Sequence, residues 1–473
     1  MKEYMKSIFI FRRDYRLNDN IGLLEALAKS IEVIPIFIFT PEQLVNNPYK
    51  SDNAVQFMIE SLEDLDEQLK NKGSRLFYFF GKPNEVLTKV IKSANADAVF
   101  VNRDYTPYSK KRDEALQKVC EKNKAKFESY EDVLLHPVGS IRTGSDEIYT
   151  KFTPYWNKAS KVKVVDIKTN KYDNYFSGRK KIVGEFKGNK AKFYKYNENL
   201  AVRGGRDNAL KILNHIDAFK KYNEERNILS KQTTRLSAYI KFGCVSIREV
   251  YHKMKDKLGM KNDLIKQLHW REFYYNIGEF YPETLSEDNK IKNLKPQYAK
   301  VPWITYATAT PAQKQLWNAW IKGETGYPVH DACQRQLLQT GFMENRGRLI
   351  VSSFLVKNMF FHYSEGEKFF SKYLADVDRF SNLGGWGWIS GSHADSSPFF
   401  RILSPIIQSQ KSDPECKYIK KWLPELKDVP NEHVHEWYKY YHLYPNVNYP
   451  KPVLDYSSSA KKTIDKYKKA LYS

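Results

Sequence analysis

The chain has 473 residues, of which 41% are hydrophobic, so it has room for two or three domains and a packed core, which argues against a largely disordered chain. Its formal net charge of +22 favours a polyanionic partner, nucleic acid before an anionic membrane, although a soluble protein that is merely rich in lysine would carry the same excess. No apolar run approaches the roughly 18 residues of a membrane span, and the start lacks a leader pattern, so we expect a soluble intracellular monomer, in cytoplasm or nucleus according to the host, without membrane contact.

Short apolar runs alternate with helical patterns in the first part of the chain. Buried strands that alternate with helices are typical of a doubly wound parallel sheet, so residues 1–135 are predicted to form a Rossmann-like α/β domain. The charged loop from Arg12 to Asn20 follows the first strand, where such sheets bind ligands, but it lacks GxGxxG and could equally be closed by local ion pairs. The apolar runs lie at 7–11, 32–39, 75–80 and 98–102, and the helical patterns at 53–72, 83–93 and 107–122.

Residues 136–205 lose this alternation and are rich in Lys, Gly, Asn and Tyr, which predicts a connector that runs over the surface. From residue 206 to residue 473 the periodicity is helical and no strand run of note occurs, so this part is predicted to be an all-helical domain. Its main helical patterns lie at 206–221, 245–257, 263–280, 311–322, 328–340, 345–362 and 366–375.

The helical part contains three groups of polar and aromatic residues with chemical potential. Hydroxyls at Thr233, Thr234 and Ser237 flank Arg235 near a predicted helix start, where they could bind phosphate or simply cap the helix. Within 263–280, one helix face carries an amide, an indole and a guanidinium, which could meet one ligand or be an aromatic core face with an exposed arginine. These three residues are Gln267, Trp270 and Arg271.

The third group is the most informative: acids, an amide, glycines and tryptophans are packed into thirteen residues. Such a mixture suits a planar, polar redox cofactor, because the acids and the amide bond its polar atoms and the glycines allow close approach. Asn382 alone could also be a helix C-cap before Leu-Gly-Gly. The group comprises Asp376, Asp378, Asn382, Gly384, Gly385, Trp386 and Trp388.

The cysteines indicate no metal site. Cys120, Cys244, Cys333 and Cys416 are scattered and form no CxxC pair. This argues against structural zinc, a local iron–sulfur motif and a disulfide framework, and favours a reducing compartment.

The chain resembles the DNA photolyase and cryptochrome family over nearly its whole length, most densely from Tyr222 to Leu426. The resemblance lies in RRDYRLNDN, TTRLSAYIKFG, WREF, the long stretch from Gly323 to Lys357, the third group above and SSPFFRILSP. It implies FAD, active as FADH⁻, and an antenna chromophore of unknown identity (folate, deazaflavin or a second flavin) in the first domain. The residues that the match implies for FAD are Tyr222, Thr233, Thr234, Arg235, Leu236, Ser237, Arg271, Arg348, Asp376, Val377, Asp378 and Asn382, with Arg348 paired to Asp376.

The same match implies a site for UV-damaged DNA. In it Trp270 and Trp388 sandwich the lesion while Asn345 and Gln267 hydrogen-bond it. Arg346, Arg401 and Gln408 would contact DNA, with Lys411, Lys420 and Lys421 beside them on a basic lip or merely on a solvated face.

The chain departs from the family pattern at Gln267, where photolyases that repair cyclobutane dimers usually carry a glutamate. Glutamine is common there in (6-4) photolyases and animal cryptochromes, but those (6-4) enzymes carry catalytic histidines where this chain has Asn345 and Leu349. Asn382 is the residue of photolyases at the position that faces flavin N5. We therefore expect a class I cyclobutane pyrimidine dimer photolyase, with a (6-4) photolyase, a receptor of cryptochrome type without repair activity and a DASH-type enzyme as alternatives.

The electron path that re-reduces the flavin also departs from the family. Trp386 matches its first tryptophan, but the middle position is Tyr363 and the terminal one falls near Thr310. Trp317 and Trp320 are candidate substitutes. We expect slow or rerouted photoreduction, while repair from FADH⁻ survives.

Overall fold

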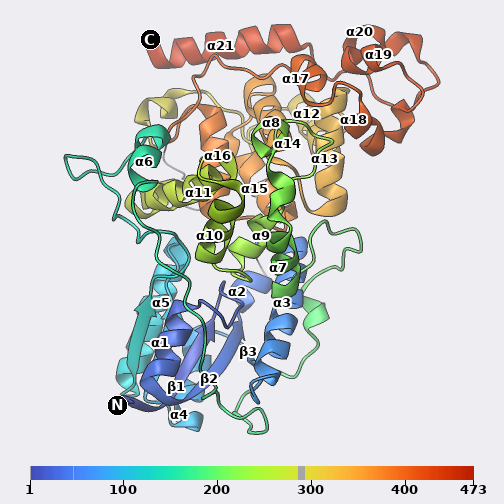
Figure 1. Ribbon diagram of the computed structural model, residues 1–473. Helices are drawn as coiled ribbons and strands as arrows, with labels where there is room; N and C mark the ends of the chain where they lie inside the picture. Colours follow the sequence, from blue (N-terminus) through green and yellow to red (C-terminus); the bar gives the residue numbers. More distant parts are fainter. Residues whose placement is uncertain (1, 46, 286–292, 473) are drawn as a thin grey trace.

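The first part of the chain forms a five-stranded parallel sheet with the order β3-β2-β1-β4-β5. In Figure 1 its strands β1, β2 and β3 are labelled in the lower part of the molecule. This computed structural model describes residues 2–45, 47–285 and 293–472. The sheet confirms the predicted α/β class, with β5 as an additional strand that the sequence did not reveal. The strands are β1 (Tyr4–Phe11), β2 (Ser30–Phe39), β3 (Phe77–Phe80), β4 (Ala98–Asn102) and β5 (Lys126–Tyr130).

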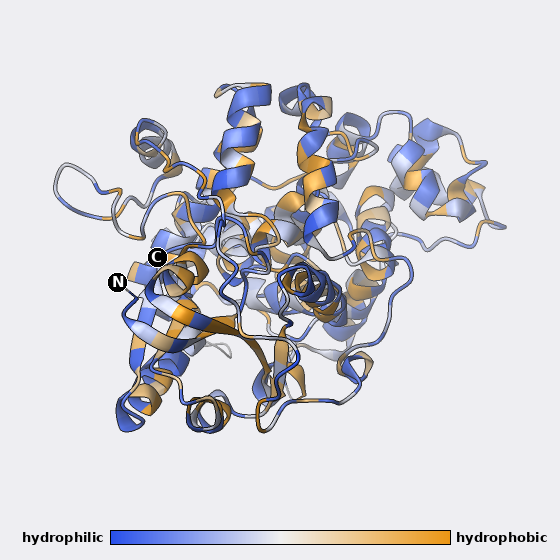
Figure 2. Ribbon diagram, turned by 60° about the horizontal axis from the view of Figure 1, so that its bottom comes forward, coloured by the Kyte–Doolittle hydropathy of each residue, from blue (hydrophilic) through white to orange (hydrophobic). Residues whose placement is uncertain are grey.

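Helices cover both faces of this sheet, as the alternating pattern requires. In Figure 2 the central strands are coloured hydrophobic, whereas the helices around them are mixed. Ser51 and Thr106 cap the starts of the two longest of these helices by accepting hydrogen bonds from Ala54 N and Ser109 N. The helices are α1 (Ile21–Lys29), α2 (Pro41–Leu44), α3 (Asp52–Lys70), α4 (Pro83–Ala94) and α5 (Pro107–Lys122).

From residue 206 onward the described chain is largely helical, which confirms the second predicted architecture. The patterns at 263–280, 311–322 and 328–340 match helices residue for residue. The α-helices are α6 (Phe152–Ala159), α7 (Arg206–Asn214), α8 (Tyr222–Glu225), α9 (Leu236–Lys241), α10 (Ile247–Leu258), α11 (Asp263–Phe280), α12 (Pro311–Lys322), α13 (Pro328–Thr340), α14 (Asn345–Ser353), α15 (Tyr363–Tyr373), α16 (Arg379–Ser390), α17 (Pro405–Ser412), α18 (Lys417–Trp422), α19 (Asn431–His435), α20 (Trp437–Tyr440) and α21 (Tyr456–Tyr472).

Two of the longer helical patterns are broken in the structure. The pattern at 206–221 is α7 followed by a short 3-10 turn, Ile216–Phe219. The pattern at 345–362 is α14 followed by a π-helical turn, Phe354–Asn358, in which Lys357 is fully buried. Lys357 donates to Phe399 O at 3.1 Å and to the Tyr467 hydroxyl at 3.1 Å, and so attaches α21 to the body of the molecule.

The segment 136–205 does more than run over the surface. Its helix α6 packs against α11, and its residues His136 and Tyr155 both hydrogen-bond the buried Glu272 of α11. Phe152 of α6 stacks on Trp270 with ring centroids 3.7 Å apart. The connector therefore supplies part of the wall behind a predicted site residue.

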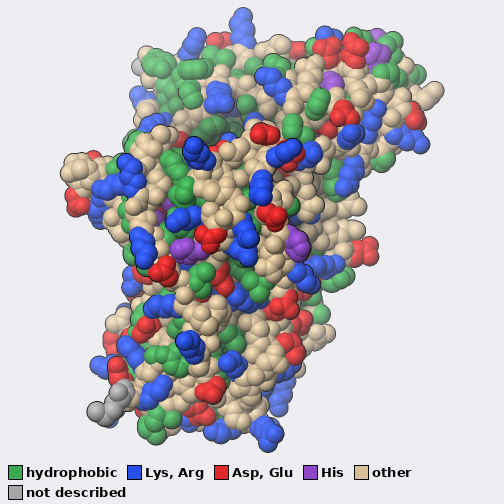
Figure 3. Space-filling view, in the orientation of Figure 1, with side chains coloured by type: hydrophobic (Ala, Val, Ile, Leu, Met, Phe, Trp, Pro, Cys, Tyr) green, Lys and Arg blue, Asp and Glu red, His purple; other side chains and the backbone are tan. Residues whose placement is uncertain are grey.

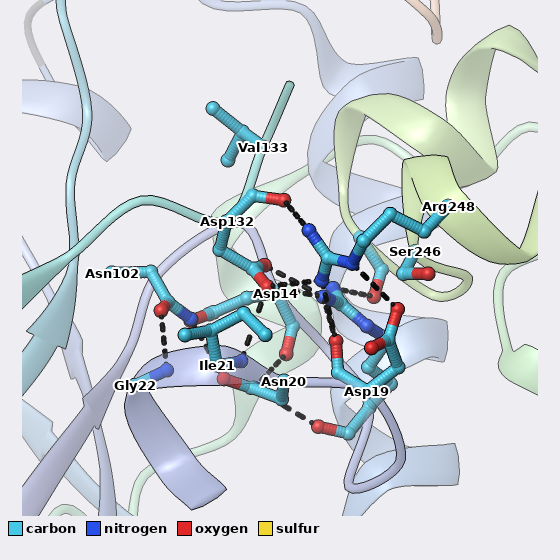
Figure 4. A network of polar contacts seen from close by, with 12 residues as sticks. Asp14, Asp19, Asn20, Ile21, Gly22, Asn102, Asp132, Val133, Ser246 and Arg248 are labelled. Atoms are coloured by element: carbon cyan, nitrogen blue, oxygen red, sulfur yellow. Dashed lines mark hydrogen bonds and ion pairs between the residues drawn. The ribbon is translucent and has the colours of Figure 1, made fainter. Parts of the chain in front are cut away.

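A buried ion network joins the sheet part to the helical part. Arg248 of α10 donates to Asp19 at 2.9 Å and to Asp132 at 2.8 Å, and Arg16 donates to Asp132 at 2.6 and 2.8 Å (Figure 4). All four side chains are 3% exposed or less. Since two arginines face two aspartates, the charges balance where no water can screen them.

Candidate functional site

The residues before α9 present hydroxyls and a guanidinium to one region. Arg235 is the N-cap of α9 and has a left-handed backbone, with φ of 53°. Thr233 donates its hydroxyl to Glu344 at 2.5 Å, and Ser237 donates to Asp376 at 2.7 Å. Because α9 has only six residues, its dipole is small, and the capacity of this segment for an anion lies in its side chains.

Arg348 and Asp376 form the ion pair that the resemblance implied. Arg348 Nη2 lies 2.9 and 2.8 Å from the two carboxylate oxygens of Asp376, and its Nε donates to Met343 O at 2.8 Å. Together with Ser237, this pair brings α9, α14 and the segment before α16 to one point. Asp376 is 6% exposed.

Asp378 is the N-cap of α16 and accepts from Ser381 N at 3.1 Å. It also accepts from the Tyr275 hydroxyl at 2.6 Å and from Arg13 of the first loop at 3.4 Å. Burial would raise the pKa of Asp378, but the charges of Arg271 and Arg13 outweigh it and keep this pKa below its ordinary value. Neither Arg13 nor Tyr275 was predicted, because both are distant from Asp378 in the sequence.

Asn382 lies inside α16, near its start, so the helix C-cap interpretation is wrong. Its amide nitrogen donates to the backbone carbonyl oxygen of Glu367 in α15 at 3.0 Å. The two glycines that follow Asn382 lie in different surroundings. A Cβ at Gly384 would lie 2.3 Å from the Tyr274 ring, whereas one at Gly385 would meet nothing within 4 Å, so Gly385 borders open space.

The face of α11 that was predicted to meet a ligand is its more accessible face. Gln267, Trp270 and Arg271 are all partly exposed, whereas Leu268 and Phe273 are buried. Phe152 covers one side of the Trp270 indole, with the two rings inclined by 10°. Arg271 donates to Val133 O at 2.6 Å and to the Tyr275 hydroxyl at 3.2 Å, which fixes its guanidinium beside the sheet part.

A group of arginines surrounds the start of α14. Asn345 is exposed there, and Arg346 hydrogen-bonds both Asn227 and Gln408. Burial and the positive charges of Arg226 and Arg401 lower the pKa of Arg346. These like charges make the start of α14 a positively charged region, which an anion would stabilise. Arg226 and Asn227 had no recognisable signal in the sequence.

The lip after α16 continues this basic region. The guanidinium of Arg401 lies 5.9 Å from the Trp388 ring, and both side chains reach solvent. Lys411 and Lys421 are exposed. On the face seen in Figure 3, however, Lys and Arg side chains are spread over both parts of the molecule, so charge alone does not locate a binding surface.

Trp386 is buried, and its aromatic neighbours are Trp320 and Phe370. Trp320 meets it edge to face at 6.4 Å, and Trp317, which is partly exposed, stacks on Trp320 at 5.3 Å. A Cβ at Gly366 would lie 2.0 Å from the Trp386 ring, so a glycine is required there. Thr310 is the N-cap of α12 and lies in none of these ring contacts.

Tyr363 is placed differently. It stacks on His362 and donates its hydroxyl to Asn293 at 3.0 Å. Burial raises its pKa far above the ordinary value. Over residues 2–45, 47–285 and 293–472, no ring contact joins Tyr363 to Trp386.

Over the same described residues, no helix is long and apolar enough to cross a membrane, and no group of three His, Cys, Asp or Glu side chains could hold a metal ion. All four cysteines are buried and unpaired.

Comparison with known proteins gives similarity over both parts of the chain. Residues 7–171 match the family described as DNA photolyase, and residues 264–469 match the FAD binding domain of DNA photolyase. A deoxyribodipyrimidine photo-lyase of Synechococcus sp. is 30% identical over 444 residues, which are 89% of this chain and 88% of the relative.

Solved structures show the same similarity. An archaeal photolyase from Sulfolobus tokodaii with two FAD molecules is 37% identical, with a TM-score of 0.86 over 98% of this chain and all of the other. A bacterial class III photolyase from Agrobacterium tumefaciens is 28% identical, with a TM-score of 0.88 over all of this chain and 99% of the other.

Proposed function

Because the chain belongs to the DNA photolyase family, we propose that it is a deoxyribodipyrimidine photo-lyase, a carbon–carbon lyase that splits cyclobutane pyrimidine dimers in UV-damaged DNA under blue light. The observation that carries this proposal is the accessible face of α11, where Trp270 is backed by Phe152 and stands beside Gln267. This face offers a flat apolar surface and an amide to the two linked pyrimidines of a flipped dimer.

The donor set fits FAD. The hydroxyls of Thr233 and Ser237, with Arg235 and Tyr222, suit a diphosphate, while Arg348 with Asp376, and Asp378, suit the polar edge of a flavin ring. Val377 and Leu236 lie between these groups in the sequence and would pack on the cofactor. Open space at Gly385 suits a ring that approaches the backbone closely. When bound in its reduced form, FAD supplies the electron that opens the dimer.

The lesion would lie between Trp270 and Trp388. Stacking on an indole stabilises a flipped base by roughly 1–3 kcal/mol, which offsets part of the cost of unstacking it. Gln267 can donate a hydrogen bond to a pyrimidine carbonyl oxygen without transferring its proton. Asn345, exposed at the start of α14, can hydrogen-bond the other base.

The phosphates beside the lesion would be held by arginines. Arg346 and Gln408 are already joined by a hydrogen bond, with Arg226 and Arg401 nearby. A phosphate between them would relieve the repulsion that lowers the pKa of Arg346. Contacts to phosphate fix the position of DNA without reading its sequence, as repair of any dimer requires.

Electrons that re-reduce the cofactor would pass from Trp317 through Trp320 to Trp386. The ring contacts at 5.3 and 6.4 Å form a continuous path from a partly exposed indole to an enclosed one. Tyr363 is a poor donor, because its oxidation requires loss of the phenolic proton and the amide oxygen of Asn293 is not a base.

A second chromophore is proposed for the sheet part. The crevice between β1 and β4, where such sheets usually bind ligands, is filled by Asp14, Asn20 and Asn102, which hydrogen-bond one another (Figure 4). A cavity of about 570 Å³ lies at the ends of β4 and β5, between Tyr105, Glu131 and Phe280. The Sulfolobus relative has two FAD molecules, and this cavity is the place that we propose for a second ring system. Its identity is tested by the absorption spectrum of chromophores released from purified protein.

The alternative function is a (6-4) photolyase, which Gln267 favours and which Asn345 and Leu349 oppose, since neither can act as the acid. The test is repair under blue light by chemically reduced, FAD-loaded protein, with two oligonucleotides in parallel, one with a cyclobutane thymine dimer and one with a (6-4) photoproduct. Restoration of the first alone supports the proposal. Restoration of the second alone assigns the (6-4) activity, and restoration of neither favours a receptor of cryptochrome type.

A further inference from the structure

A buried acid, Glu344, lies against a hydroxyl that is proposed for the FAD diphosphate. Glu344 is 5% exposed and is the N-cap residue of α14. An acid at this position often caps its own helix, but the side chain of Glu344 makes no such bond and instead accepts the Thr233 hydroxyl at 2.5 Å. The carboxylate therefore takes the hydrogen that Thr233 has to donate.

The other oxygen of this carboxylate has no hydrogen-bond donor. Among the described residues none donates to Glu344 Oε1, and the nearest cation, Arg235, places its Nε 3.7 Å away. Arg235 is held in another direction, because its Nη1 donates to Ala201 O at 3.3 Å. A buried charge without close partners is costly, so the ionised form of Glu344 is only weakly supported.

The other charged and titratable groups around Glu344 do not supply the missing partner. Arg348 lies one turn further along α14, but its Nη2 contacts the two oxygens of Asp376 at 2.9 and 2.8 Å. Tyr222 of α8 and Tyr418 of α18 lie within range of the Glu344 charge. Burial raises the pKa of both phenols, so both stay neutral.

These surroundings favour the protonated form of Glu344. Burial raises its pKa above the ordinary value, and the opposing effects of Thr233, Arg235 and Arg348 do not cancel this rise. Asp376 differs, because both of its oxygens face Arg348 directly. Of the two acids at this place, Glu344 is therefore the one that can take up a proton at the lower cost.

A diphosphate would change the balance of charges at this point. In its absence the cations Arg235 and Arg348 face the anions Glu344 and Asp376, two against two. The two negative charges of a diphosphate would leave an excess of anions, and two of these anions would compete for the hydrogen of Thr233. Nearby negative charges favour the neutral form of a carboxyl, first of all the one with the weakest partners.

We infer that Glu344 takes up a proton when FAD binds, so that the protein binds the cofactor together with one proton and releases both as the pH rises. The protonated acid donates its O–H to Thr233 Oγ, and Thr233 donates its own hydrogen to a phosphate oxygen. The proton comes from solvent, and the O–H of the acid is the only covalent bond that forms. This inference rests on the proposed binding of FAD by the residues before α9, and it concerns binding alone, without light and without DNA.

The test starts from FAD-loaded protein and measures the dissociation constant of oxidised FAD by equilibrium dialysis between pH 5 and pH 8. The diphosphate stays doubly charged over this range, so it adds no titration of its own. Affinity should fall as pH rises, by about tenfold per pH unit at most, because ionised Glu344 must first be protonated. Affinity should level off at a pH where Glu344 is ionised in the free and in the bound protein.

Glu344→Gln imitates the protonated acid, because its amide N–H can donate to Thr233 Oγ. This variant should bind FAD about as tightly at every pH as wild type does at low pH. Calorimetry in two buffers of different ionisation enthalpy should show that wild type takes up a proton on binding FAD and that Glu344→Gln does not. The matched control is Glu425→Gln, from the pair of 2.6 Å with Arg335, which should keep the wild-type pH dependence.

Thr233→Val tests the exchange of hydrogen bonds itself. At low pH it should weaken FAD binding by about tenfold, the worth of one hydrogen bond to a charged group. At high pH it should have little effect, because ionised Glu344 then holds the Thr233 hydroxyl in any case. In the Glu344→Gln background the same change should cost about tenfold at every pH. The single variant Thr233→Val also serves if Glu344→Gln does not fold.

An equal pH dependence in wild type and Glu344→Gln overturns the inference, as does an affinity that rises with pH. The proposed function is decided separately, by repair. A chain that repairs dimers and binds FAD equally at every pH keeps the proposed function and loses this inference. A chain that couples FAD to a proton and repairs no lesion does the reverse, and absence of FAD binding at every pH overturns both.

Discussion

The ring of Trp320 meets the ring of Trp386 edge to face, with centroids 6.4 Å apart, and Trp317 continues the contact towards solvent. Replacing Trp320 with Phe keeps a ring in place and removes the oxidisable indole. Photoreduction of oxidised, FAD-loaded protein should slow by about tenfold or more, corresponding to at least ~1.4 kcal/mol in the barrier.

The controls for this prediction are Tyr363→Phe and chemical reduction. Tyr363→Phe should photoreduce at the wild-type rate, and repair by chemically reduced Trp320→Phe should be unchanged. If photoreduction were slow in Tyr363→Phe and as fast as wild type in Trp320→Phe, the electron path would run through the tyrosine instead.

Phe152 stacks on Trp270 at 3.7 Å and should hold that indole ready for a flipped base. Phe152→Ala should weaken binding of dimer-containing DNA by about 1 kcal/mol, or roughly fivefold, since such aromatic pairs are worth about that much. Binding is measured by fluorescence anisotropy with irradiated and undamaged oligonucleotides. The control is Phe193→Ala, which removes a stacked ring beside β3. Equal losses of DNA affinity in both variants would mean that Phe152 has no specific role in lesion binding.

Gln267 should limit repair of cyclobutane dimers. Gln267→Glu restores the carboxyl that the family usually has there, so the quantum yield of dimer splitting should rise, by up to about tenfold if one charge-assisted hydrogen bond is gained. Single-turnover repair by reduced protein measures this. Glu also introduces a negative charge near DNA, so affinity is recorded separately. A lower yield at saturating DNA would mean that the site is tuned around glutamine.

The buried network of Arg16, Asp19, Asp132 and Arg248 should be a major contribution to stability. Arg248→Met leaves the buried Asp19 carboxylate without its ion-pair partner, whereas Asp132 keeps Arg16, and loss of one partner from a buried pair costs about 3–5 kcal/mol of unfolding free energy. Urea unfolding followed by circular dichroism measures the loss. Lys163→Met, from the exposed pair with Asp166, should change nothing measurable, and a similarly small effect of Arg248→Met would contradict the prediction.

Lys357 should make stability rise with pH above neutrality. Burial lowers its pKa from the ordinary 10.5 to about 7. Between these values the unfolded chain binds a proton that the folded chain has lost, so unfolding free energy increases with pH, by about 2 kcal/mol from pH 7 to pH 9. Below about pH 6 both states bind the proton and this contribution is flat.

Lys357→Met removes this dependence. The difference in unfolding free energy between wild type and variant should move in favour of wild type as pH rises from 7 to 9, and stay constant from 5 to 6. A constant difference throughout would mean that the folded lysine keeps its charge, sustained by Tyr467 and the carbonyl of Phe399.

The elements with strong periodicity could be predicted from the sequence, because burial of one face imposes it. Strand β5, KFESY, could not, since it is at the sheet edge and none of its residues is fully buried. The run Asn382-Leu-Gly-Gly suggested a helix end, yet α16 continues through it. Gly384 is required inside this helix because the Tyr274 ring leaves no room for a side chain there.

The candidate site was predicted where it depends on residue types and motifs, as with Arg348 and Asp376. The residues that were missed act through partners far away in the sequence. Arg13 reaches Asp378 across 365 positions, and Phe152 meets Trp270 from a segment without periodicity. The burial of Glu367 could not be predicted from the sequence. An acid in a helical pattern is usually solvated, and no local motif indicates its hydrogen bond with Arg379.

The shared charges between α10 and the sheet part also restrict how this protein can be recombined. A chimaera that takes residues of one part from a relative and keeps the other would bring together arginines and aspartates that had not been selected as a set. Any chimaera must therefore keep Asp19, Asp132, Arg16 and Arg248 together, because each buried charge needs its partner from this set. A sheet part exchanged without these four side chains would leave buried charges unpaired at its junction with α10.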